Sequence, residues 1–255
     1  GWTITGITAV SVTMTTDHDQ LFASEVWHTQ DNVFYLGLWD SETSFISQAT
    51  PPWTSKLSGI PADQIVSLSV TCLNGADIVD LSAMDEDHFD DLSWTYIKGD
   101  AGGDQLKGTF THDEIRGDDG NDTINAGDGA DTLYGGPDND TINGDEGVDV
   151  IEGNAGMDTI HGGDGNDEIR GNDGDDFLYG DGGADLIYGG ADNDFISGWD
   201  GNDELYGEAG DDWVAGESGN DLISGGNGSD ILWSGTGGVA DQPWDGTGGT
   251  SGWHD

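Results

Sequence analysis

A nine-residue repeat constrains the fold of this chain more than any other feature of its sequence. Counted from Gly99, the repeat runs to Trp233 without insertion or deletion, which makes fifteen units. Position 8 is leucine, isoleucine or valine in every unit, position 1 is glycine in fourteen and position 4 is glycine in twelve. Such a period is typical of solenoids, in which each repeat packs against its neighbours. Position 6 is aspartate in all fifteen units: Asp104, Asp113, Asp122, Asp131, Asp140, Asp149, Asp158, Asp167, Asp176, Asp185, Asp194, Asp203, Asp212, Asp221 and Asp230.

The spacing within a unit predicts a turn followed by a short strand. Glycine adopts positive φ at little cost, so positions 1 to 6 can form a tight turn that directs several carbonyl oxygens toward one point. The aspartate at position 6 adds a carboxylate, and hard oxygen donors of this kind suit Ca²⁺. Positions 7 to 9 then form a strand whose middle residue points inward. The alternative, that these aspartates only shape solvated turns, does not explain why every unit has one at the same position.

The pattern resembles the nonapeptide GGxGxDxUx of RTX proteins, with U aliphatic, over residues 99–233. The resemblance implies an all-β, calcium-binding parallel β-roll in which two units form one coil and Ca²⁺ lies between stacked turns. Each ion would be bound by an aspartate from both turns and by backbone carbonyls. The implied first column is Asp104, Asp122, Asp140, Asp158, Asp176, Asp194, Asp212 and Asp230, and the other seven aspartates form the second. Eight and seven rungs leave seven and six gaps, so the resemblance implies up to about thirteen Ca²⁺ ions.

The segments on either side of the regular repeat differ from it. Residues 72–98 hold three further units in the same frame, and we interpret them as degenerate repeats. Residues 1–71 contain alternating or apolar runs at 3–16, 33–39 and 65–71 that predict strands, so we expect an N-terminal β-rich cap on the roll. Residues 234–255 form a tail rich in glycine and threonine that contains two tryptophans, Trp244 and Trp253.

The charge of the chain limits its partners. Aspartate and glutamate number 52 and lysine and arginine only 5, which gives a net charge of −47. Nucleic acids and anionic membranes require basic surfaces, so neither is an expected partner. The sequence has no run of 18 apolar residues, which argues against a transmembrane helix. Thirteen divalent ions would supply 26 positive charges (13 × 2) against these 47 negative ones.

Calcium does not account for a row of apolar residues at position 7. In alternate units this position reads Thr123, Thr141, Thr159, Phe177, Phe195, Trp213 and Ile231, and position 9 adds Tyr188 and Tyr206 on the opposite face. Residues at this spacing would form ladders along the roll, because adjacent strands lie about 4.8 Å apart. An apolar ladder on an acidic solenoid indicates a contact surface. Its occupant could be the chain's own tail, a second copy, or a glycan or ice surface.

The sequence favours a structural role over catalysis. It contains no HExxH or GxSxG motif, and Cys72 is its single cysteine. We therefore expect a non-enzymatic, calcium-binding protein that self-associates into an extracellular filament, surface layer or adhesive matrix. The resemblance implies secretion or display on a bacterial cell surface, with possible contact to glycans. The alternative is a C-terminal calcium-folding and secretion module of a larger RTX enzyme, toxin or adhesin.

Overall fold

The computed structural model describes residues 67–72, 74–82, 84 and 92–235 with their side chains. It also describes the backbone of the short strands at 10–13, 19–22, 36–40, 54–55 and 244–245. All the regular elements in these residues are β-strands. Within the same residues, no helix has the length and apolar character that a membrane crossing requires. The all-β prediction is therefore confirmed.

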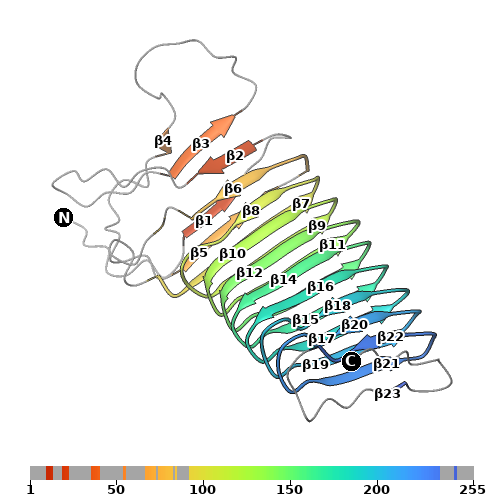
Figure 1. Cartoon of the computed structure of the whole chain (residues 1–255). Coiled ribbons are helices and arrows are strands. Elements are labelled where there is room, and N and C mark those ends of the chain that lie inside the picture. The colour runs from red at the N-terminus through yellow and green to blue at the C-terminus, as the bar shows by residue number, and fades with distance from the viewer. Residues whose placement is uncertain are drawn as a thin grey trace, which may run out of the picture.

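The strands form two sheets that are wound into one elongated roll (Figure 1). Neighbouring strands are parallel in both sheets, except at the N-terminal end of the second sheet, where β2 pairs with β3 and β3 with β4 antiparallel. In spatial order, sheet A consists of β1 (Val10–Thr13), β5 (Ser67–Thr71), β7 (Trp94–Ala101), β9 (Asp113–Asp119), β11 (Thr132–Pro137), β13 (Val150–Ala155), β15 (Glu168–Asp173), β17 (Leu186–Ala191), β19 (Glu204–Ala209), β21 (Leu222–Gly226) and β23 (Trp244–Asp245). Sheet B consists of β22 (Ile231–Trp233), β20 (Trp213–Ala215), β18 (Phe195–Ser197), β16 (Phe177–Gly182), β14 (Thr159–Asp164), β12 (Thr141–Gly147), β10 (Thr123–Gly129), β8 (Gln105–Lys107), β6 (Ile78–Asp80), β2 (Asp19–Phe22), β3 (Leu36–Asp40) and β4 (Thr54–Ser55).

The register of these sheets confirms that two units make one coil. Thr123 pairs with Thr141 in sheet B, and Thr132 with Val150 in sheet A, so each residue lies beside the one 18 positions later. Every aliphatic residue at position 8 is buried between the two sheets, as the repeat predicts. Its members are Leu106, Ile115, Ile124, Leu133, Ile142, Ile151, Ile160, Ile169, Leu178, Ile187, Ile196, Leu205, Val214, Ile223 and Leu232. Burial of one such side chain contributes roughly 1.5–3 kcal/mol, so this line of residues is the core of the roll.

Many strands are longer than the three residues that the repeat predicts. Strand β14 begins at position 7 with Thr159 but continues to Asp164 at position 3 of the next unit. The extension arises because successive turns have the same backbone conformation, so their residues also pair across coils, as Gly163 does with Asp145. The turns are therefore held by the sheets and are not separate loops.

The N-terminal end of the roll departs from the 18-residue coil. Strand β6 pairs with β8, and β5 with β7, at an offset of 27 residues, for example Val79 with Leu106. Three unit lengths instead of two thus separate these paired strands. The first and third of the degenerate units supply β6 and β7, which bury Val79 and Ile97. The residues at positions 6 and 8 of the second, Glu86 and His88, lie outside the described residues.

Strands from the N-terminal 71 residues complete the roll where we expect a cap. Strand β1 pairs with β5 and β2 with β6, both in parallel, so each sheet continues toward the N-terminus. Strand β5 is itself a rung of sheet A, which places the beginning of the roll before residue 72. At the other end, β23 pairs with β21, and residues 246–255 lie outside the described part.

Candidate metal centre

The aspartates at position 6 form two buried columns along the roll. In each regular rung, the backbone N–H of one aspartate donates a hydrogen bond to Oδ1 of the aspartate one coil further on. These N–Oδ1 distances range from 2.7 to 3.1 Å. All fifteen side chains are buried. The structure therefore stacks these residues in the two columns that the resemblance implied.

The second carboxylate oxygen of most of these aspartates is buried without a hydrogen bond from the protein. This applies to Oδ2 of Asp104, Asp122, Asp131, Asp140, Asp149, Asp158, Asp167, Asp176, Asp185, Asp194, Asp203, Asp212 and Asp230. An ionised carboxylate without a partner is costly to bury, because it loses the hydration that it has in water. The columns thus present a series of oxygen atoms that a cation would stabilise.

The pKa values of the column carboxyls also indicate that their negative charge lacks a partner. Burial raises these pKa values, and the neighbouring carboxylates raise many of them further, although the backbone N–H bonds lower them in part. The pKa rises to about 8 in Asp131, Asp140 and Asp194, to about 7 in Asp104, Asp122, Asp149, Asp176 and Asp185, and to about 6 in Asp113, Asp158, Asp203 and Asp212. The charged form therefore requires a compensating positive charge near neutral pH.

Glycines at positions 1 and 4 let the oxygens of two coils approach the backbone more closely than any side chain would allow. A Cβ atom added to Gly135 would stand 2.3 Å from Asp140 Oδ2 and 2.8 Å from the carbonyl oxygen of Gly153 on the next coil. A Cβ atom on Gly147 would stand 1.4 Å from the carbonyl oxygen of Gly129 and 3.1 Å from Asp149 Oδ1. Carboxylate and carbonyl oxygens from adjacent coils thus converge on the space that the absent side chains leave.

The donor set fits Ca²⁺ better than a transition metal. Within the described part of the chain, no three His, Cys, Asp or Glu side chains come together as the ligands of one metal ion, so a site made of side chains alone is absent there. A stacked site offers two carboxylates, and its remaining donors are backbone carbonyls. Oxygen-only coordination by carboxylates and carbonyls suits Ca²⁺, whereas imidazole and thiolate ligands select zinc or copper. Bound calcium would neutralise the column carboxylates and link adjacent coils. The extra acids at position 3, such as Asp128 and Asp164, are exposed.

The first column continues to a residue that the sequence-based set of ligands omits. Asp77 is buried and its N–H donates to Oδ1 of Asp104 at 2.7 Å, as in the regular rungs. The signal was present in the sequence, because Asp77 occupies position 6 of the segment CLNGADIVD. The separation of 27 residues from Asp104 hides this rung from an 18-residue count.

Asp113 differs from the other members of its column. Its N–H donates to Asp131 Oδ1 at 2.7 Å, but its own oxygens accept hydrogen bonds from Thr109. The corresponding rung of the preceding coil is Thr95 instead of an aspartate, and Thr95 N–H donates to the His112 carbonyl at 3.0 Å. The second column therefore begins differently from the first.

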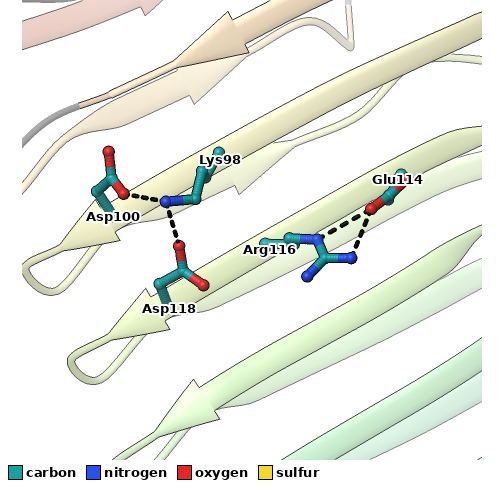
Figure 2. Close-up of polar contacts among 5 residues, drawn as sticks. All are labelled: Lys98, Asp100, Glu114, Arg116 and Asp118. Carbon is teal, nitrogen blue, oxygen red and sulfur yellow. Dashed lines mark hydrogen bonds and ion pairs between the residues drawn. The ribbon is translucent and has the colours of Figure 1, made fainter.

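Basic side chains lie beside the first coils of the roll. Lys98 Nζ contacts the carboxylates of Asp100 and Asp118, which lie on adjacent coils, with a distance of 2.8 Å to Asp118 Oδ2 (Figure 2). These hydrogen bonds raise the pKa of the Lys98 ammonium. Arg116 donates two hydrogen bonds to Glu114 Oε1, at 2.7 and 2.9 Å (Figure 2). Protein cations thus pair with acids at the N-terminal end of the roll.

The fold and the columns define a calcium-binding parallel β-roll. A family model of the RTX calcium-binding nonapeptide repeat matches residues 98–133, 116–151, 126–160, 152–187, 179–214 and 206–238, which together span more than half of the chain. The chain belongs to this family, and its repeats bind calcium. Proteins with these repeats are typically secreted, which fits an extracellular location. No curated protein is found that matches the chain.

Proposed function

We propose that the chain is a non-catalytic structural protein that self-associates, once calcium has folded it, into an extracellular filament, layer or matrix. One observation carries the proposal: in a chain of net charge −47, the outer face of sheet B has no acidic residue at positions 7 and 9 of β8 to β22. The residues at these positions are Gln105, Lys107, Thr123, Asn125, Thr141, Asn143, Thr159, His161, Phe177, Tyr179, Phe195, Ser197, Trp213, Ala215, Ile231 and Trp233. The corresponding positions of sheet A include Glu114, Glu152, Glu168 and Glu204.

The C-terminal half of this face carries an apolar row. Phe177, Phe195, Trp213 and Ile231 lie in register on four neighbouring strands. The ring centroids of Phe177 and Phe195 are 6.1 Å apart, and those of Phe195 and Trp213 are 4.7 Å apart. Phe177, Trp213 and Ile231 nevertheless remain 42%, 48% and 58% exposed. An exposed apolar row of this kind supports a protein contact.

A second copy of the chain is the occupant that these observations favour. Strand β23 pairs with β21 in sheet A, so Trp244 and Asp245 lie at the end of that sheet. Two molecules of high negative charge repel each other, and a face without acids at positions 7 and 9 is the surface where they can approach with the least opposition. Thr123, Thr141 and Thr159 continue the same row and would leave a neutral polar surface beside the apolar contact.

Light scattering and electron microscopy in millimolar calcium test this proposal. The Phe177→Ser/Trp213→Ser variant should assemble much less than the wild type. The matched Tyr188→Ser/Tyr206→Ser variant, which removes a stacked pair from sheet A with centroids 5.1 Å apart, should assemble normally. Circular dichroism in calcium checks that both variants fold. A wild-type protein that stays monomeric at high concentration would contradict self-association.

Three alternatives are distinguishable by experiment. A chain ending at Trp233 would assemble more strongly than the full chain if the tail covers the apolar row, and Phe177→Ser/Trp213→Ser would abolish that gain. Retention of the monomer on a neutral polysaccharide, lost in the same double variant, would instead indicate glycan binding. The module alternative is decided by the length of the natural gene product, because a much longer product would make these residues one part of a larger secreted protein.

A further inference from the structure

The turn of the unit at 108–116 differs from those of the other fourteen units. In those fourteen, the residue at position 2 has a positive φ of 68° to 128°, whether it is glycine, aspartate, asparagine, glutamate or tryptophan. Thr109 occupies this position here and has no positive φ, and neither has Thr111 at position 4. A β-branched residue strongly disfavours the left-handed region, so these two threonines impose a different turn.

The altered turn directs Thr109 onto the carboxylate of Asp113. Thr109 N donates to Asp113 Oδ2 at 2.6 Å, and Thr109 Oγ1 lies 2.9 Å from Oδ1 and 3.2 Å from Oδ2. Thr109 Oγ1 also accepts a hydrogen bond from Thr111 N at 3.2 Å. Both oxygens of this buried carboxylate therefore have partners within their own turn, in contrast to the neighbouring Asp131, whose Oδ2 has none.

The carbonyl side of the turn is also changed. A Cβ atom on Gly129 would stand 2.3 Å from the Thr111 carbonyl oxygen of the preceding coil. The equivalent distances in regular rungs are 1.4 to 1.9 Å, for example 1.4 Å from Gly147 to Gly129 and 1.9 Å from Gly156 to Asp138. The position 4 carbonyl is therefore displaced at the only rung where a threonine provides it.

We propose that Thr109 takes the place of calcium at Asp113, so that the calcium sites of the second column begin at Asp131. Asp113 is then a structural rung and not a metal ligand, which reverses the role that the repeat predicts for it. The first column, from Asp77 to Asp230, has nine aspartates and eight gaps, and the second, from Asp131 to Asp221, has six aspartates and five gaps. The second column thus starts on a coil that carries its own hydrogen-bond donors.

Counting the bound calcium in the full chain tests the assignment. Wild-type, Asp113→Asn and Asp149→Asn proteins are saturated with calcium and freed of excess ion, and the ions per chain are measured by elemental analysis. Asp149 is the matched control, because it belongs to the same column and has the regular contacts on both sides. The Asp113→Asn protein should bind as many ions as the wild type, whereas Asp149→Asn should lose one or two. An equal loss in both variants would overturn the proposal.

A gain of function provides a second, independent measurement. The Thr109→Gly/Thr111→Gly variant restores the glycine pattern of the other turns and releases the Asp113 oxygens, so it should bind one ion more than the wild type. An unchanged count in a folded variant would contradict the idea that the threonines exclude calcium. If circular dichroism shows that this variant does not fold in excess calcium, the comparison of Asp113→Asn with Asp149→Asn still decides.

Discussion

The first coils of the roll and the later coils neutralise their acids in different ways. Lys98, Lys107 and Arg116 lie in the first coils and make up three of the chain's five basic residues, whereas Arg170 is the only one between residues 117 and 235. In the first coils, Lys98 contacts two carboxylates, and Thr109 donates hydrogen bonds to the carboxylate of Asp113. The Oδ2 atoms of column aspartates in the later coils, such as Asp140 and Asp167, have no hydrogen bond from the protein and lie close to a glycine, and in the first coils the same is true of Asp104.

The comparison shows why a repeated core of this kind depends on an external ion. A lysine or arginine side chain needs room, but a Cβ atom at position 1 would already stand 2.2 to 2.5 Å from the column carboxylate. A protein cation can therefore serve acids on the outer surface of the roll but not those of the columns. Only a small ion, or a short donor such as the Thr109 hydroxyl, fits beside the buried carboxylate.

The largest expected effect is the loss of the later coils when calcium is removed. In chelator, carboxylates on adjacent coils, about 4.8 Å apart, repel each other without compensation. Calcium binding energy is then folding energy, so residues 123–233 should lose their β structure and amide protection. The first coils, from β7 to β9, should retain more protection. Circular dichroism and hydrogen exchange in chelator and in millimolar Ca²⁺ measure this difference.

The same experiment with Mg²⁺ sharpens the comparison. Magnesium prefers a small octahedral site with retained water, so it should substitute poorly for calcium. A roll that is equally folded in chelator and in calcium, or one whose first coils unfold before the later ones, would contradict the division into two regions.

A smaller effect is expected from the loss of single rungs within the calcium-dependent region. Asp167 accepts a hydrogen bond from Asp149 N and donates one to Asp185 Oδ1, so it links two neighbours. Asp230 accepts from Asp212 N at the end of its column. Nearest-neighbour coupling in a solenoid predicts that Asp167→Ala shifts the calcium midpoint several-fold more than Asp230→Ala. Equal shifts in calcium titrations would count against stacked columns.

The sequence predicted the regular part of the roll well because one local rule generates it. An aliphatic residue at position 8, such as Ile160, must be buried, and an aspartate at position 6, such as Asp158, must follow the glycine turn. The structure confirms the parallel roll and the burial of the core. Of the three departures from glycine at position 4, Asp138 and Asp192 still adopt positive φ, because aspartate tolerates this conformation.

The rest could not be predicted because it depends on contacts between distant segments. The 27-residue offset between β6 and β8 is a matter of register, and a local nine-residue pattern does not encode which strands pair. Asp77 was omitted for that reason. The hydrogen bonds of Thr109 to Asp113 depend on the backbone torsions of this turn. The nine-residue pattern registers Thr111 only as a missing glycine and does not predict these torsions.

Acid should partly replace calcium in the later coils. Burial raises the pKa of Asp158 to about 6, of Asp176 to about 7 and of Asp194 to about 8, from 3.8. Because the folded pKa lies above the unfolded one, the protonated carboxyls make their full contribution to the stability of the apo roll below pH 3.8. This stability is lost as the pH rises through 6 to 8. In chelator, circular dichroism should thus show more β structure at pH 5 than at pH 8.

The calcium concentration needed to fold the roll should rise as the pH falls, although the apo chain itself gains β structure. Because the ligands must be deprotonated to bind the ion, more calcium is needed to fold the roll at pH 5 than at pH 8. A calcium midpoint that is independent of pH, or an apo chain that gains nothing at pH 5, would show that the column carboxyls do not titrate in this range.

The smallest expected effect concerns the lysine of the first coils. The Lys98 side chain is 30% exposed, so Lys98→Gln should cost less than about 1 kcal/mol of unfolding free energy in calcium. Lys107 is the matched control, because its side chain is 47% exposed and its Nζ lies 3.4 Å from Asp80 Oδ2. If Lys98 does in the first coils what calcium does in the later ones, Lys98→Gln should lower amide protection of β7 and β9 more in chelator than in calcium, and Lys107→Gln should have little effect on either. An equal loss of protection in both media would mean that this lysine is an ordinary surface ion pair, and the difference between the two regions would then depend on Thr109 alone.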